Sequence, residues 1–274
     1  MRIYTKSGDL AFKTFTFPDG QPHFKLETYE REFDTVTIEV ALRSGSDLLL
    51  TVLASDTLRQ HGYQSVLLDV RYLLGARMDR AISVMEPFTL QSVARIINSC
   101  GFSTVRILDV HSEVAIRLIR NSENVLPRRI VQQVHCTCEN ALPVAPDKGA
   151  VTRLEEYFVE YVRAEKTRDL KTGKLSGFTI VDPSFIKNSP VLIIDDICDG
   201  GGTFVGLAKE LRKAGATKVY LFVTHGVFSK GPDCLEGIDC IYTTDSYCPN
   251  RIEGNWGYVP VRPVTVIPVS MERM

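Results

Sequence analysis

Short apolar runs alternate along the chain with segments in which apolar residues recur every three or four positions. The apolar runs predict buried strands at residues 46–53, 65–70 and 104–110. Helical spacing predicts helices at residues 55–61, 89–100 and 112–120. Gly101 fits the end of the second helix, because glycine readily adopts the left-handed conformation of a C-cap. The order strand, helix, strand, helix predicts a parallel sheet covered by helices.

The pattern restarts after a polar stretch with a proline at residues 121–129, so a domain junction is expected there. We therefore predict two α/β domains, residues 1–128 and 129–274. In the second domain, strands are predicted at residues 142–145, 157–162, 191–194 and 218–224. Helices are predicted at residues 149–156 and 203–214, a hairpin turn at 171–177, and an edge strand or packing arm at 258–268, near Trp256.

Composition excludes several classes of protein. The 274 residues include 32 Lys+Arg and 33 Asp+Glu, a net charge of −1, whereas proteins that coat nucleic acid or an anionic membrane need a basic excess. The apolar runs are too short for a membrane span, and the first residues do not resemble a signal peptide. Seven cysteines without zinc-finger spacing indicate a reducing compartment. We therefore expect a cytoplasmic protein that binds neither nucleic acid nor membranes.

Residues 191–203 are the most informative segment. A strand of four apolar residues leads to Asp195 and Asp196, and a turn with Asp199 and three glycines leads to a helix at Thr203. Ligands bind at the carboxyl ends of strands in open α/β sheets, and a glycine loop before a helix favours phosphate. Carboxylates suit ribose hydroxyls, directly or through Mg²⁺. The segment is neither a Walker A loop nor a dinucleotide fingerprint.

The ribose-phosphate prediction thus covers one continuous set of residues. Its members are Asp195, Asp196, Asp199, Gly200, Gly201, Gly202 and Thr203.

Charged residues outside this loop are further candidates. Lys166 and Arg168 lie two positions apart, so on an extended segment they point to the same side and could stabilise a transferring phosphoryl group; a solvated surface hairpin is the alternative. His111 follows a predicted strand, with Asp109 expected on the same face, and could bind metal or phosphate. Arg77 lies on a polar loop, where a surface ion pair is the alternative.

The glycine loop resembles the loop that binds 5-phosphoribosyl 1-diphosphate in type I phosphoribosyltransferases and in ribose-phosphate pyrophosphokinases. Other segments resemble the second family, in its chain order, and phosphoribosyltransferases lack this N-terminal half. These segments are residues 17–21, 72–79, 108–111, 144–149, 165–168 and 224–229. The chain is thereby identified as similar to ribose-phosphate pyrophosphokinases over most of its length.

The resemblance implies two tandem phosphoribosyltransferase-like domains, each a mainly parallel sheet flanked by helices. It also implies Mg²⁺ as cofactor, ATP as co-substrate, and a homodimer or higher homo-oligomer. For ATP binding it implies Phe17, Asp19, Gln21, Arg77 and Asp79, although the family usually has Glu at the position of Gln21. For metal binding it implies His111 and Asp147, and for catalysis Lys166, Arg168 and His111.

The activity implied is transfer of the β,γ-diphosphate of ATP to the 1-hydroxyl of ribose 5-phosphate, which yields 5-phosphoribosyl 1-diphosphate and AMP. Glycines at positions 200–202 depart from the family pattern and leave space, so a larger acceptor such as ADP-ribose, in NAD metabolism, is an alternative. A non-catalytic synthetase-associated regulator and a type I phosphoribosyltransferase are further alternatives.

Overall fold

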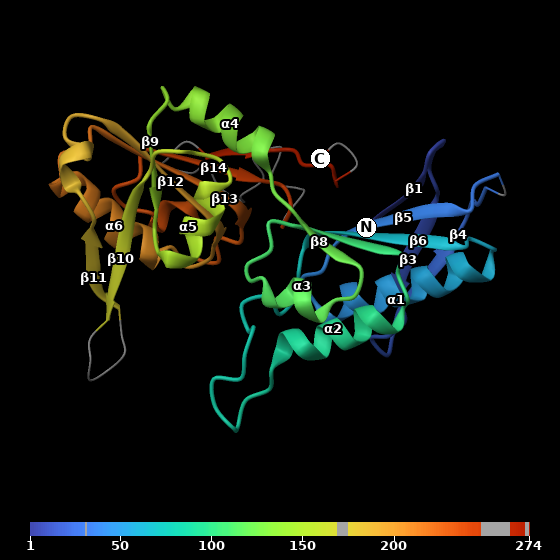
Figure 1. Cartoon of the computed structure of the whole chain (residues 1–274). Coiled ribbons are helices and arrows are strands. Elements are labelled where there is room, and N and C mark those ends of the chain that lie inside the picture. Colours follow the sequence, from blue (N-terminus) through green and yellow to red (C-terminus); the bar gives the residue numbers. More distant parts are fainter. Residues whose placement is uncertain (31, 169–174, 248–263, 272–273) are drawn as a thin grey trace. The chain divides into compact units, whose positions relative to one another are not determined.

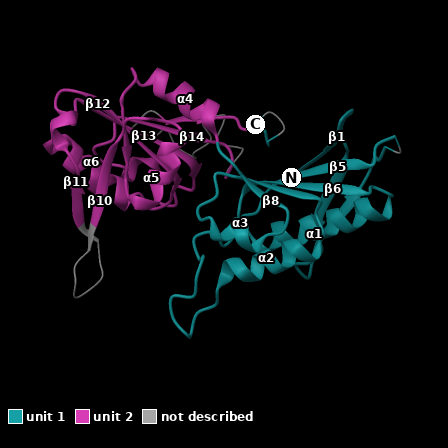
Figure 2. Ribbon diagram, viewed as in Figure 1, with its two compact units in different colours: residues 1–126, 270–274 teal, residues 127–269 magenta. Residues whose placement is uncertain are grey.

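The computed structural model describes residues 1–30, 32–168, 175–247, 264–271 and 274, and the chain forms two compact units (Figures 1 and 2). Unit 1 contains residues 1–126 and 270–274, and unit 2 contains residues 127–269. The sequence interpretation placed the last five residues in the second domain. They belong to unit 1, where the backbone N–H of Met271 donates to the carboxylate of Glu39 at 3.3 Å.

Unit 1 is built on a six-stranded sheet in the order β2-β1-β5-β6-β7-β8, in which β5 to β8 are parallel (Figure 1). These strands are β1 (Arg2–Thr5), β2 (Gly8–Asp9), β5 (Thr35–Ala41), β6 (Ser65–Tyr72), β7 (Thr104–Leu108) and β8 (Ser122–Val125). A separate antiparallel hairpin consists of β3 (Phe12–Thr16) and β4 (Pro22–Leu26). The helices are α1 (Gly45–Gln60), α2 (Thr89–Ser99) and α3 (Val114–Leu118).

The predicted strand at residues 46–53 is wrong, because this segment is the first half of α1. Ser44 caps the helix by accepting the N–H of Asp47 at 3.1 Å, and the Asp47 carboxylate accepts the N–H of Arg43 at 3.0 Å. This arrangement resembles a capping box, except that the N–H accepted by the Asp47 side chain belongs to Arg43, the residue before the N-cap. Leucine is a good helix former as well as a common residue of buried strands, so its presence does not distinguish the two. The N-terminal cap is the local feature that indicates a helix here.

Unit 2 is built on a seven-stranded sheet in the order β11-β10-β9-β12-β13-β14-β15, parallel except for β11. These strands are β9 (Leu142–Ala145), β10 (Val162–Arg168), β11 (Leu175–Ile180), β12 (Pro190–Cys198), β13 (Lys218–Gly226), β14 (Cys240–Thr244) and β15 (Val264–Ile267). The helices are α4 (Arg128–Thr137), α5 (Lys148–Glu155) and α6 (Gly202–Lys213), with short 3-10 turns η1 (Pro183–Ile186) and η2 (Pro232–Cys234). The predicted α/β class with mainly parallel sheets is confirmed.

Three other predictions in unit 2 have mixed outcomes. The predicted strand at 157–162 is wrong apart from Val162, because the N–H groups of Tyr157 and Phe158 bond back to Leu154 and extend the end of α5. The C-terminal run does supply an edge strand, β15, whereas Trp256 and residues 258–263 lie outside the described residues. Most of the predicted hairpin turn, residues 171–174, also lies outside them.

The described helices include none that is both long enough and apolar enough to cross a membrane.

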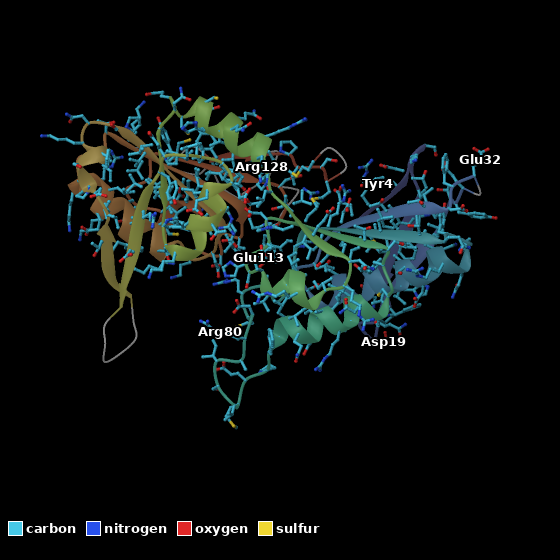
Figure 3. The ribbon with its side chains drawn as sticks, in the orientation of Figure 1. Tyr4, Asp19, Glu32, Arg80, Glu113 and Arg128 are labelled. Carbon is cyan, nitrogen blue, oxygen red and sulfur yellow. The ribbon has the colours of Figure 1, made fainter. Side chains whose placement is uncertain are left out.

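A buried carboxylate ties three strands of unit 1 together. Asp69 of β6 is fully buried, and its Oδ1 accepts Nε of Arg106, from β7, at 2.7 Å. Its Oδ2 accepts a second guanidinium N–H of Arg106 and the hydroxyl of Tyr4, the latter at 2.9 Å (Tyr4 is labelled in Figure 3). Burial, with the charge of Asp69, raises the pKa of Tyr4, which therefore remains a hydrogen-bond donor. Every bond in this network satisfies a charge that would otherwise be costly to bury.

Replacing Arg106 by Met should leave the Asp69 carboxylate buried without its cation. We expect the free energy of unfolding to fall by about 3 kcal/mol, measured by urea denaturation. Exposed Arg95 on α2 provides the control, since its replacement by Met should change stability by less than about 0.5 kcal/mol. Equal effects of the two substitutions would contradict this account of the network.

Candidate functional site

The predicted residues of unit 2 gather at the carboxyl ends of three neighbouring parallel strands, β10, β9 and β12. Lys166 lies near the end of β10, Asp147 follows β9, and Asp195 and Asp196 lie near the end of β12. Strand β9 has β10 as its neighbour on one flank and β12 as its neighbour on the other. The chain therefore passes from β9 to β10 on the first flank and then crosses to β12 on the second. Such a reversal of strand order is where open α/β sheets bind ligands.

The three glycines between β12 and α6 have different structural requirements. Gly201 has φ +74°, and a Cβ there would lie 2.6 Å from Cδ2 of Leu235, so only glycine fits. A Cβ on Gly200 would make ordinary contact with the Lys230 side chain at 3.7 Å, and one on Gly202 would meet nothing within 4 Å. Gly201 therefore shapes the loop, while Gly202 faces open space.

The end of the loop is suited to bind an anion. Gly201 is the N-cap of α6 and has no side chain that could cap this helix. The first N–H groups of an α-helix lack partners within the helix and carry its positive partial charge. A phosphate can accept hydrogen bonds from such groups, so Gly202 and Thr203 could contribute backbone donors.

The two carboxylates of β12 share one cation that the sequence interpretation missed. Nη1 of Arg153, in the last turn of α5, lies 3.3 Å from Oδ1 of Asp195, and Nη2 lies 3.5 Å from Oδ1 of Asp196. All three side chains are largely buried. Burial and the adjacent Asp196 charge raise the pKa of Asp195 well above its ordinary value, and Arg153 opposes this shift. One cation therefore serves two adjacent carboxylates and compensates their charge only in part.

Lys166 and Asp147, predicted separately, form an ion pair with Nζ 2.5 Å from Oδ2. Asp147 is also the N-cap of α5, since its Oδ1 accepts the N–H of Ala150 at 3.1 Å. Burial opposes ionisation of Asp147, but the hydrogen bond and charge of Lys166 and the N–H groups of Ala150 and Gly149 lower its pKa overall. Arg168 belongs to β10, and its side chain lies outside the described residues.

Three of the residues predicted to bind ATP, Phe17, Asp19 and Gln21, lie on the β3–β4 turn of unit 1. Asp19 and Gln21 are exposed there, and the N–H of Gln21 donates to Oδ1 of Asp19 at 3.1 Å (Asp19 is labelled in Figure 3). The ring of Phe17 lies 4.9 Å from that of Phe15 and 5.5 Å from that of His23. Sequence interpretation did not predict this aromatic cluster. A prediction of the β3–β4 hairpin would have revealed it, because the hairpin places Phe15 opposite His23.

Two further candidates follow adjacent parallel strands of unit 1. Arg77 follows β6 and His111 follows β7, so both lie at the same edge of the sheet, and both are exposed. Asp79, on the Arg77 loop, is half-buried. The expected shared face of Asp109 and His111 is wrong: β7 ends at Leu108, and Asp109 turns inward with φ +40° and is buried.

Among the described residues, no group of three or more His, Cys, Asp or Glu side chains is placed to hold a metal ion. The predicted ligands Asp147 and His111 belong to different units. Asp147 nevertheless offers a carboxylate, and Mg²⁺ commonly binds through one or two carboxylates together with substrate phosphates and water. The donor type therefore fits Mg²⁺.

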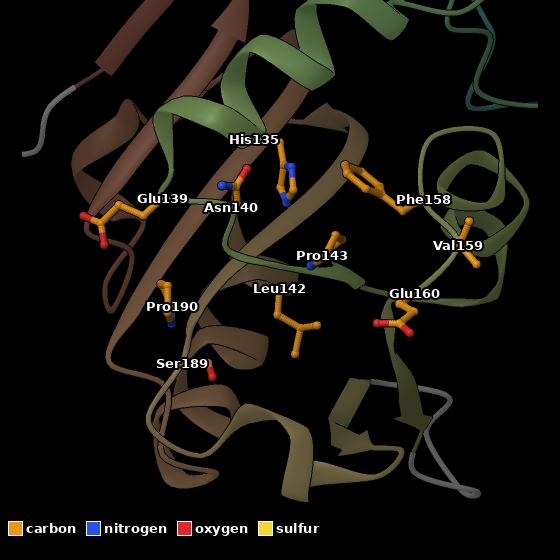
Figure 4. Close-up of a pocket in the computed structure, with 10 residues that line it drawn as sticks. All are labelled: His135, Glu139, Asn140, Leu142, Pro143, Phe158, Val159, Glu160, Ser189 and Pro190. Carbon is orange, nitrogen blue, oxygen red and sulfur yellow. The ribbon is translucent and has the colours of Figure 1, made fainter.

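A pocket of unit 2 lies away from this site (Figure 4). Its lining includes Leu142 and Pro190, the first residues of β9 and β12, together with His135 and Phe158. The glycine loop follows the last residue of β12, so the pocket is at the opposite edge of the sheet.

Replacing Gly201 by Ala should destabilise the protein, because it adds both backbone strain and a clash with Leu235. We expect a loss of at least about 2 kcal/mol in the free energy of unfolding, measured by urea denaturation. Replacing Gly202 by Ala is the matched control and should leave stability unchanged or raise it by up to about 1 kcal/mol. Similar losses for both variants would argue against the role of Gly201.

Comparisons with known proteins relate the chain to a family and to a known fold. A family model described as "Phosphoribosyl synthetase-associated domain" matches residues 182–250, which include the glycine loop. The crystal structure of phosphoribosylpyrophosphate synthetase from Mycobacterium smegmatis superposes with a TM-score of 0.77 at 20% identity, covering 94% of this chain and 86% of that one. That likeness supports the fold of two phosphoribosyltransferase-like domains.

Two curated relatives carry the closer sequence evidence. The ribose-phosphate pyrophosphokinase of Thermococcus kodakarensis is 33% identical over 221 residues, 78% of this chain and 77% of the relative. The protein of the same name from Pyrococcus furiosus is 29% identical over 222 residues, with the same shares covered. By this similarity, the chain belongs to the ribose-phosphate pyrophosphokinase family.

Proposed function

We propose that the chain transfers the β,γ-diphosphate of ATP to the 1-hydroxyl of ribose 5-phosphate. The oxygen of that hydroxyl attacks the β-phosphorus, the bond from the β-phosphorus to the oxygen shared with the α-phosphate breaks, and AMP leaves while the hydroxyl proton is released. The products are 5-phosphoribosyl 1-diphosphate and AMP. Family membership is the observation that carries the proposal.

Charge compensation is the main task of the protein in such a transfer, because negative charge spreads over the oxygens of the transferring group. Lys166 and Arg168 are the cations that we assign to this role, and both belong to β10. The Lys166–Asp147 ion pair places the ammonium at the edge of the sheet where β12 carries its carboxylates. This shared edge supports the assignment of Lys166.

The acceptor is assigned to β12 and the loop that follows it. Asp195 and Asp196 would accept the ribose hydroxyls, and residues 199–203 would hold the 5-phosphate. A carboxylate is an acceptor only, so it matches a hydroxyl donor, and the backbone N–H groups at the start of α6 match a phosphate. Gly201 supports this role because its positive φ shapes the turn that leads into the N-terminus of α6.

ATP is assigned to unit 1. The exposed ring of Phe17, with Asp19 and Gln21 beside it, would contact the adenosine, and Arg77 and Asp79 would contact the nucleotide from their loop. Mg²⁺ is the proposed cofactor, with Asp147 and His111 as proposed ligands; when bound, it neutralises phosphate charge. His111 would also contact Mg·ATP.

ADP-ribose is the second acceptor that we consider, because the open space at Gly202 could admit a second phosphate. The names of the curated relatives favour ribose 5-phosphate. A non-catalytic regulator is disfavoured because Lys166, Arg168 and His111 are all present. A phosphoribosyltransferase would need no ATP, which separates it experimentally.

We further propose that the enzyme acts in the cytoplasm as a homo-oligomer. The described cysteines at positions 100, 136, 138, 198, 234 and 240 are free thiols, as expected in a reducing compartment.

An assay of products tests the proposed reaction. The purified protein with ATP and Mg²⁺ should form AMP and a 1-diphosphate from ribose 5-phosphate. Product formation is monitored by ³¹P NMR, and EDTA should abolish the product signals. ADP-ribose is tested in parallel at the same concentration. The proposal fails if ATP yields no AMP with either acceptor. Turnover of ADP-ribose alone would keep the chemistry but replace the acceptor.

Replacing Lys166 by Met should lower kcat by about 10²- to 10³-fold, the usual cost of removing one group that stabilises developing charge. Exposed Lys209 on α6 provides the matched control, and its replacement by Met should leave kcat unchanged. Steady-state rates at saturating ATP and acceptor measure both variants. A kcat close to the wild-type value in the Lys166 variant would remove Lys166 from the proposed mechanism.

A further inference from the structure

Arg153 contacts both carboxylates assigned to the acceptor ribose. We propose that Arg153 is a positioning residue that holds Asp195 and Asp196 ready to accept the ribose hydroxyls. This inference rests on the proposed function and adds a residue to that same site. Arg153 itself touches the carboxylates, not the reacting atoms.

The geometry favours an arginine at this position. Nη1 approaches Asp195 and Nη2 approaches Asp196, so two different nitrogens serve two different side chains. A guanidinium presents its N–H groups in a rigid planar fork, whereas a lysine ammonium is a single point charge on a flexible stem. One arginine can therefore fix the directions of two neighbouring carboxylates, which a lysine cannot do to the same extent.

Burial gives the contact its strength. The Arg153 side chain is 10% exposed, and those of Asp195 and Asp196 are 14% and 4% exposed. Water screens charges little in such surroundings, so the three groups depend on one another for compensation. Without the cation, the two adjacent carboxylates would repel each other and turn apart or take up a proton, and a protonated carboxyl no longer matches a hydroxyl donor as well.

Helix α5 connects this contact to Lys166 of β10. Asp147 caps the first turn of α5 and pairs with Lys166 of β10, and Arg153 lies in the last turn of the same helix. One short helix thus carries a partner of the proposed catalytic cation at one end and the partner of the acceptor carboxylates at the other. The position of α5 sets both contacts.

The test replaces Arg153 by Lys, which keeps the charge but not the fork. We expect KM and the calorimetric Kd for ribose 5-phosphate to rise about tenfold, with KM for ATP unchanged, because the effect is confined to the acceptor carboxylates. Replacing Arg153 by Met should raise the acceptor Kd further. The Tm of each variant identifies any that fails to fold.

Arg212 supplies a matched control within the same unit. It lies in the last turn of α6 and pairs with the carboxylate of Asp239, so replacing it by Lys disturbs a more exposed ion pair away from the glycine loop. This variant should keep the wild-type constants for both substrates.

The inference is overturned if the Arg153→Lys variant keeps the wild-type Kd and KM for the acceptor, or if KM for ATP rises equally. Direct binding of ribose 5-phosphate separates this outcome from failure of the proposed function. A wild-type protein that binds ribose 5-phosphate but forms no AMP refutes the reaction only, and the Kd of the Arg153→Lys variant still decides the positioning role. A wild-type protein that binds neither ribose 5-phosphate nor ADP-ribose overturns both.

Discussion

Buried carboxylates on parallel strands are the constraint on which both units depend. Such a group is stable only when a cation or several hydrogen-bond donors compensate its charge, and removing one partner of a buried pair typically costs about 3–5 kcal/mol. In unit 1 the cation comes from the neighbouring strand, where Arg106 pairs with Asp69. In unit 2 it comes from α5, where Arg153 meets Asp195 and Asp196. The first ion pair lies within the sheet, whereas the second lies towards its carboxyl edge, where open α/β sheets bind ligands.

Strand order explains why so many charges meet at that edge. Parallel strands bring their carboxyl ends to one side of the sheet, and β9 lies between β10 and β12. Each of these three strands contributes one part of the site: a cation, a helix cap with its carboxylate, and a pair of carboxylates followed by the glycine loop. These parts meet because their strands are neighbours in the sheet, so no long loop is needed to bring them together.

Local patterns predicted the parts of the fold that depend on nearby residues. Helix α2 and strand β9 lie where periodicity placed them, and β12 continues beyond the predicted end at residue 194 to Cys198. The glycine loop was recognised because its three glycines stand between a predicted strand and a predicted helix. The run at residues 46–53 misled because leucines suit a core strand and a helix equally, and only the cap formed by Ser44 and Asp47 distinguishes them. Arg153 could not be predicted, since its partners lie more than 40 residues away and no local pattern links them.

The contact between Gly201 and Leu235 makes the shape of the glycine loop a property of two distant segments. A smaller residue at position 235 would remove the steric restriction on position 201, but the positive φ would still favour glycine or asparagine there. The conformation of the glycine loop is therefore restricted both by its own backbone and by the packing of Leu235. A residue more than 30 positions further along the chain thus helps to determine which residue the loop can carry.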